Sequence, residues 1–173
     1  MNKYYFQACY QLIAESEKQI NHPLDKDVES YVVRLTANKF DDPSLGYNKP
    51  VSITKFMLCE STLEKYKILK ETGDTCLLVS SLIPFVAQRF GLSLSYFISI
   101  GKTAFYELGK DIEPSTNIYI KMYQQFSYVR DVVENAFTHK QYSIEHLIVL
   151  SKHGSSFAQK VLKGTNLDKG FIC

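Results

Sequence analysis

Apolar residues recur along most of the chain at the three- and four-residue spacing of an amphipathic helix. The segment 26–40 shows this most clearly, because Val28, Tyr31, Val32 and Leu35 fall at positions i, i+3, i+4 and i+7. No long segment alternates between apolar and polar residues as a half-buried strand would. The pattern predicts an all-α protein. We expect a single-domain bundle of about seven to eight helices over residues 1–164, followed by a flexible tail at 165–173.

Two strongly apolar segments, 75–90 and 95–108, form the predicted centre of this bundle as a helical hairpin with its turn at 91–93. Neither has a polar stripe wide enough for a surface helix, so we expect both to be buried. Pro84 lies late in the first segment and has no backbone N–H to donate. A kink or an end of that helix is therefore expected near residues 82–85.

Glycines set the predicted limits of the two central helices. Gly73 and Asp74 are expected to break the chain before the first of them, with Asp74 as the N-cap of the new helix. Gly109 is expected just after the end of the second helix, in the C′ position. The other predicted helices are 3–20, ended by Pro23, then 26–40, a helix from Ser52, 61–70, 116–138 and a last helix from Ser143 to about 164.

Composition narrows the class of protein. Of the 173 residues, 45% are hydrophobic and 22% charged, which is ordinary for a globular chain and argues against disorder. The net charge is only +2, and the Lys and Arg residues are spread along the chain. Nucleic-acid binding usually needs such charge concentrated on one face. The sequence therefore predicts no nucleic-acid partner.

The cysteines bear on location. Cys9, Cys59, Cys76 and Cys173 form no C-x-x-C pair, which fits a reducing cytoplasm better than a disulfide scaffold. The N-terminus has no apolar run of signal-peptide length. The longest apolar windows are about half of a membrane span. We therefore predict a cytoplasmic protein with no membrane-spanning helix.

One set of residues resembles a family of small bacterial all-helical proteins of unknown function. The resemblance lies in residues 24–40, in 69–84 with its Gly73-Asp74 pair, and in Ser95-Tyr96-Phe97, Gly101, Ala104 and Phe105. Phe97 and Phe105 depart from the family pattern, where tyrosine is usual, and Ser80 or Ser81 stands near a usual small residue. The resemblance implies an all-helical fold and a bacterial cytoplasmic origin, and it implies no activity.

Motifs for catalysis and metal binding are missing from the sequence. His139, His146 and His153 recur every seven residues, about 10.5 Å along a helix, which is too far apart to bind one metal. Asp131 and Glu134 have the spacing of a carboxylate pair, but the Glu-x-x-His of a di-metal bundle does not occur. There is also no nucleophile elbow and no phosphate-binding loop. We therefore predict no catalytic residue, no metal and no cofactor.

The central hairpin contains one candidate binding site. Lys102 interrupts an apolar helix, and Gly101 beside it would let a ligand or another backbone approach closely. In one interpretation a polar pocket is lined by Lys102, Gly101, Tyr96, Tyr106, Arg89 and Asp74. In the other, Lys102 extends to the surface and Gly101 allows tight helix packing.

Two functions remain open from the sequence. The load of 12 Tyr and 11 Phe favours a non-catalytic protein-interaction or regulatory module that binds another protein or a second copy of itself, because aromatic residues are enriched at interfaces. The alternative is a binder of a small apolar or acyl-chain ligand in a cavity beside the central hairpin.

Overall fold

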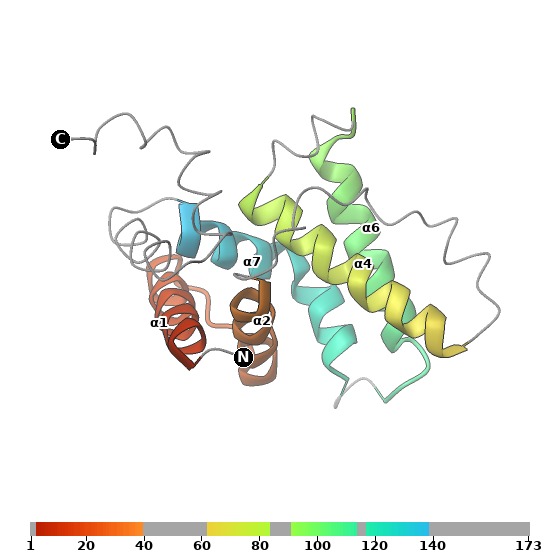
Figure 1. Cartoon of the computed structure of the whole chain (residues 1–173), viewed down its shortest axis with the longest axis horizontal. Helices are drawn as coiled ribbons and strands as arrows, with labels where there is room; N and C mark the ends of the chain where they lie inside the picture. Colours follow the sequence, from red (N-terminus) through yellow and green to blue (C-terminus); the bar gives the residue numbers. More distant parts are fainter. Residues whose placement is uncertain (1–2, 40–61, 84–90, 114–116, 139–173) are drawn as a thin grey trace. The chain divides into compact units, whose positions relative to one another are not determined.

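The computed structural model describes residues 3–39, 62–83, 91–113 and 117–138, except for the side chains of residues 3–5 and 138. The regular secondary structure in these ranges is all helical and includes no strand, which confirms the all-α prediction for this part of the chain. The five helices are α1 (Lys3–Gln19), α2 (Lys26–Lys39), α4 (Thr62–Leu82), α6 (Leu94–Gly109) and α7 (Ile118–Thr138) (Figure 1). The predicted loop at 41–51 and the helices predicted from Ser52 and Ser143 lie outside the described residues.

The helices belong to two compact units. The first unit contains α1, α2 and residues 131–138 of α7. The second contains α4, α6 and residues 118–130 of α7. The limits predicted for the domain and its tail, 1–164 and 165–173, end outside the described residues and stay predictions.

The first unit is held together by the apolar stripes of α1 and α2, which pack against each other. Leu12 and Ile13 of α1 are buried, as are Val28 and Val32 of α2. Leu35, one helical turn further along, is buried too, so the predicted stripe of α2 is confirmed at these positions. The bounds of both helices agree with the predicted ones to within one residue.

Polar side chains join α1 to the last turns of α7. The buried Ser16 hydroxyl donates to the Val132 carbonyl oxygen at 2.8 Å. Asn135 Nδ2 donates to Ser16 Oγ at 3.0 Å and to Gln19 Oε1 at 3.1 Å. These bonds compensate the burial of the hydroxyl, which would otherwise oppose folding.

The turn between α1 and α2 follows the predicted stop before Pro23. Asn21 adopts a left-handed conformation with φ 52°, which asparagine tolerates better than most residues. The chain then returns so that the Leu24 N–H donates to Glu17 Oε1 at 3.3 Å. Burial, followed by the neighbouring Glu29 carboxylate, raises the pKa of Glu17, and the bond from Leu24 opposes this only in part.

We expect Glu17→Gln to stabilise the protein more at neutral than at acidic pH. Because the folded state raises the pKa of Glu17, it binds more protons than the unfolded state above about pH 4.3, and wild-type stability falls as the pH rises through that range. Glutamine keeps an acceptor for Leu24 without the charge. The increase in the free energy of unfolding at neutral pH should stay below about 1 kcal/mol, because the half-buried Glu17 side chain is screened by solvent. Urea unfolding at about pH 4 and 7 measures it, and a pH-independent difference between the variants would contradict the assignment.

Helix α4 corrects one prediction about the second unit. The sequence predicts a helix over 61–70, a break at Gly73-Asp74 and a new helix from residue 75. Instead, α4 runs without interruption from Thr62 to Leu82. Asp74 is therefore an interior residue of the helix, and it is not an N-cap.

Packing against α6 explains the glycine inside α4. A Cβ atom at Gly73 would lie 2.9 Å from two ring carbons of Phe105, which is closer than a real contact allows. A glycine inside a helix weakens it by about 1 kcal/mol relative to alanine, and here its missing side chain gives the Phe105 ring its space. The helices α4 and α6 cross closely at this point (Figure 1).

The C-terminal half of α4 is buried almost all round, as predicted for the first central segment. The buried residues there are Thr72, Gly73, Asp74, Cys76, Leu77, Leu78, Val79, Ser80, Ser81 and Leu82. The hydroxyls of Ser80 and Ser81 both donate to the Leu77 carbonyl oxygen, so their burial leaves no hydroxyl donor unsatisfied. The helix ends two residues before Pro84, in agreement with the predicted stop.

Helix α6 begins after the predicted turn at 91–93, and it ends differently from the prediction. Ser93 is its N-cap, and Ser93 Oγ accepts from the Tyr96 N–H at 3.2 Å. Gly109 is the last helical residue and does not occupy the predicted C′ position. It lies against α7, where a Cβ would be 2.7 Å from Ile120 and 2.9 Å from Asn117.

Asn117 connects α6 to α7 and was not anticipated from the sequence. Its side chain is buried. Nδ2 donates to the Gly109 carbonyl oxygen at 2.7 Å, and Oδ1 accepts from the Tyr119 N–H at 2.9 Å. One amide therefore satisfies a carbonyl at the end of α6 and an N–H at the start of α7.

The long amphipathic helix predicted over 116–138 is confirmed as α7. Along its predicted buried edge, Met122, Phe126, Val129, Val133 and Phe137 are buried and Ile118 is partly exposed. Among the described residues, no helix is both long enough and apolar enough to cross a membrane.

Candidate functional site

The six residues of the predicted pocket do not share one site. Asp74 lies inside α4 and is 6% exposed, with its carboxylate bound to Lys70 of the same helix. Gly101 lies on the buried side of α6. Lys102, Tyr96 and Tyr106 lie on the same helix with partly or largely exposed side chains, and Arg89 falls outside the described residues.

Gly101 allows close packing of three helices of the second unit. A Cβ atom there would lie 2.7 Å from two ring carbons of Phe126 on α7 and 2.9 Å from Cys76 Cβ on α4. The space beside the glycine is thus filled by protein atoms. This contact supports the packing interpretation of Gly101.

The exposed positions of α6 form one outward side of the helix. The prediction that α6 lacks an exposed face is therefore wrong. We define the α6 face as Tyr96, Ser99, Thr103 and Tyr106, which lie within about 80° of one another around the helix and are all exposed. The exposed fraction is 37% for Tyr96 and 44% for Tyr106.

The α6 face carries no charge, which is unusual for the exposed side of a helix. The charged residues of α6 are Lys102 and Glu107, which are both partly exposed and border the face on its two sides. Serine, threonine and tyrosine are also poorer helix formers than Lys or Glu by a few tenths of a kcal/mol each. Helix propensity therefore does not account for this choice of residues.

Lys102 and Tyr106 contact the same aromatic ring on α7. Lys102 Nζ lies 5.4 Å from the centroid of the Tyr123 ring, at cation–π distance. The Tyr106 ring lies 5.3 Å from Tyr123, tilted by 56°. Tyr123 is half-buried and was not predicted from the sequence. It orients Lys102 along the edge of the face and supports Tyr106 in an exposed position.

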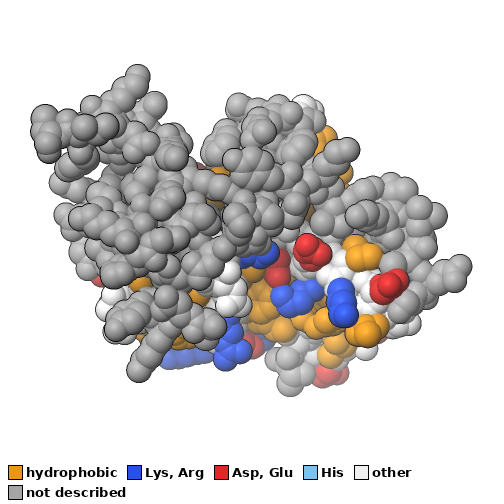
Figure 2. Space-filling view, viewed as in Figure 1, with side chains coloured by type: hydrophobic (Ala, Val, Ile, Leu, Met, Phe, Trp, Pro, Cys, Tyr) orange, Lys and Arg blue, Asp and Glu red, His pale blue; other side chains and the backbone are white. Residues whose placement is uncertain are grey.

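The N-terminal half of α4 has the composition expected of a solvated helix. Its exposed or partly exposed residues include Glu64, Lys65, Lys67, Lys70 and Glu71. Figure 2 shows charged side chains of both signs among apolar ones over α4. The contrast within one compact unit indicates that the composition of the α6 face is particular to that helix.

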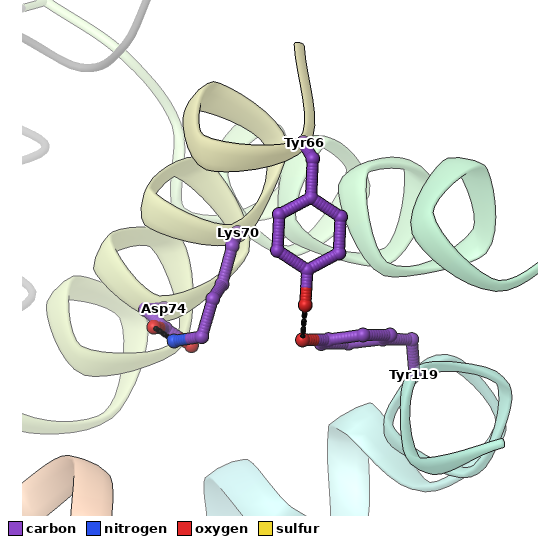
Figure 3. A network of polar contacts seen from close by, with 4 residues as sticks. All are labelled: Tyr66, Lys70, Asp74 and Tyr119. Atoms are coloured by element: carbon purple, nitrogen blue, oxygen red, sulfur yellow. Dashed lines mark hydrogen bonds and ion pairs between the residues drawn. The ribbon is translucent and has the colours of Figure 1, made fainter. Parts of the chain in front are cut away.

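A second group of polar residues joins α4 to α7 (Figure 3). The hydroxyls of Tyr66 and Tyr119 lie 2.5 Å apart, and the two rings meet edge to face with centroids 6.0 Å apart. Tyr119 also stacks on Phe105 of α6 at 6.3 Å. One helical turn from Tyr66, Lys70 Nζ donates to Asp74 Oδ2 at 2.6 Å.

Tyr119 is unsuited to act as a general base. Burial, the hydrogen bond with Tyr66 and the nearby Asp74 carboxylate all raise the pKa of Tyr119. Its phenol therefore stays protonated at neutral pH, where a general base must lose its proton. The pair acts as a hydrogen-bonded contact between two helices.

The two described cysteines, Cys9 and Cys76, are buried and form no disulfide. Burial raises the pKa of both Cys9 and Cys76 to about 12, so neither forms the thiolate that a nucleophile or metal ligand requires. Within the described ranges, no three His, Cys, Asp or Glu side chains are grouped so that they could hold a metal ion. His139, His146 and His153 lie outside those ranges.

Comparisons of the chain with models of known protein families, with curated proteins and with solved structures find no match. The resemblance to small bacterial helical proteins stays a prediction. The function must therefore be inferred from the residues of this chain.

Proposed function

We propose that the protein is a non-catalytic interaction module that binds a protein partner through the α6 face. The observation that carries the proposal is the uncharged, tyrosine-containing surface of Tyr96, Ser99, Thr103 and Tyr106 on an exposed helix. Interface cores are depleted in charged residues and enriched in tyrosine relative to the rest of a protein surface.

Energetics support the same surface. An exposed tyrosine brings a large ring and a hydroxyl to an interface and loses only two side-chain torsions on binding. The Tyr106 ring already packs against Tyr123, so part of its side-chain conformational entropy is lost before a partner binds. Ser99 and Thr103 between the two tyrosines are small, which lets a partner approach the helix closely.

We do not propose the apolar-ligand site, because Phe126 and Cys76 fill the space beside Gly101 where that ligand was expected. The cytoplasmic location, the bacterial origin and the absence of a nucleic-acid partner remain predictions from the sequence.

Site-specific photo-cross-linking in the native host tests the proposal. A photoreactive residue at Ser99 should give one discrete cross-linked product on irradiation, and the same residue at the exposed Lys67 of α4 should give none. Adding Tyr106→Glu to the Ser99 variant should abolish the product, because a carboxylate would be buried in the interface without a partner. Equal products at both positions, or none at Ser99, would contradict the proposal.

A further inference from the structure

The α6 face has the same spacing when it is followed in either direction. Tyr96, Ser99, Thr103 and Tyr106 are separated by three, four and three residues, so a tyrosine stands at each end and a small hydroxyl residue at each inner position. All four side chains are exposed on one side of a single helix. An antiparallel copy of the helix would therefore present the same residue types in the same order.

We propose that the partner bound by the α6 face is a second copy of this chain, with the two α6 helices antiparallel about a twofold axis near residue 101. This inference rests on the proposed function and names the partner. A twofold interface is self-complementary, because each residue i that contacts j is matched by j contacting i. Here Tyr96 would meet the partner's Tyr106, and Ser99 would meet the partner's Thr103.

Side-chain size fits this arrangement. The four residues span about 15 Å along the helix. At the centre, near the axis, Ser99 and Thr103 are small enough for two helices to approach closely. At each end a tyrosine from one copy would lie beside a tyrosine from the other, an arrangement that aromatic rings favour when they are offset or edge to face.

Charge also fits this arrangement. The two charged residues of α6, Lys102 and Glu107, border the face and are not among its four residues, so two copies of the face meet with no charged residue in the pairs 96–106 and 99–103. Lys102 lies at the edge, with Nζ over the Tyr123 ring of its own chain. Antiparallel helices place the positive N-terminal end of one dipole beside the negative C-terminal end of the other.

The size of the surface sets the expected affinity. A face about 15 Å long on one helix is smaller than the roughly 800 Å² per partner of a standard protein interface. We therefore expect a weak, reversible dimer rather than a permanent one.

Two double variants, compared by sedimentation velocity over a range of concentrations, test both the surface and the orientation. Ser99→Lys with Thr103→Lys places like charges opposite each other, and it should weaken dimerisation by about tenfold or more. Ser99→Glu with Thr103→Lys places opposite charges together only in the antiparallel register. It should keep the dimer, whereas a parallel register would separate the copies. Thr62→Lys with Leu63→Lys, at exposed positions of α4, is the control and should leave the dimer unchanged.

Circular dichroism confirms that each variant keeps its helices. A dimer that survives Ser99→Lys with Thr103→Lys, or one lost in Ser99→Glu with Thr103→Lys, would overturn the proposed pairing. A wild-type chain that stays monomeric at several hundred micromolar would overturn the self-association itself. The broader proposal would then be tested by the photo-cross-link at Ser99. A cross-linked product whose mass differs from that of two chains would identify a different protein partner.

Discussion

Replacing Phe126 with alanine is expected to lower the free energy of unfolding by about 3–5 kcal/mol, because the change removes a fully buried ring. Phe126 is 0% exposed, its centroid lies 6.1 Å from that of Phe105, and it occupies the space left by Gly101. One substitution thus opens a cavity where α4, α6 and α7 meet. Urea unfolding followed by circular dichroism measures the loss.

Leu63→Ala is the control for this experiment. Leu63 is 63% exposed on α4, so its truncation should change the free energy of unfolding by no more than about 0.5 kcal/mol. Similar losses for the two variants would show that Phe126 does not anchor the core of the second unit.

Gly101→Ala should also destabilise the protein, although alanine is the better helix former. The added methyl would lie 2.7 Å from two Phe126 ring carbons and 2.9 Å from Cys76 Cβ, so one of the helices must move. Overpacking of this kind costs about 1–3 kcal/mol. The expected net effect is a loss of about 1–2 kcal/mol, because part of the strain is offset by the helix propensity of alanine. Ser99→Ala, an exposed position of the same helix, should be neutral or slightly stabilising.

A double-mutant cycle tests the cause of that loss. If the added methyl clashes with the ring, Gly101→Ala should be tolerated better in a Phe126→Leu background than in the wild type. Additive effects of the two substitutions would show that the methyl acts elsewhere.

The sequence predicted the helices of the described part well wherever an apolar stripe was clear. The stripes of α2 and α7 and the end of α4 before Pro84 all agree with the structure. Local patterns suffice there, because the spacing of apolar residues and the chemistry of proline act within a few residues.

The glycines were misread because their role depends on residues far away in the chain. Gly73 and Gly109 were taken as a helix break and a helix cap, which is their usual local meaning. Both are interior or terminal helical residues that make room for Phe105 and Ile120. From the local sequence alone, a glycine at a close contact between helices cannot be distinguished from a glycine at a helix end.

Only some residues of the candidate site were predicted from the sequence, and its form was not. Tyr96, Lys102 and Tyr106 were expected to line a pocket, and they lie on or beside an exposed face. Tyr123, Ser99 and Thr103 were not predicted as site residues. The near absence of charge from Leu94 to Tyr106 indicated burial, and the same pattern is also expected of a helix that meets a partner.

The burial of the cysteines has a practical consequence for following the motions of this protein. Cys9 lies in the first compact unit and Cys76 in the second, and both thiols are protected by packing. In a chain with Cys59→Ser and Cys173→Ser, a thiol reagent can reach either position only when its own unit opens. The two labelling rates then report the opening of each unit separately. Cys9 and Cys76 therefore serve as natural reporters of local unfolding, one in each compact unit.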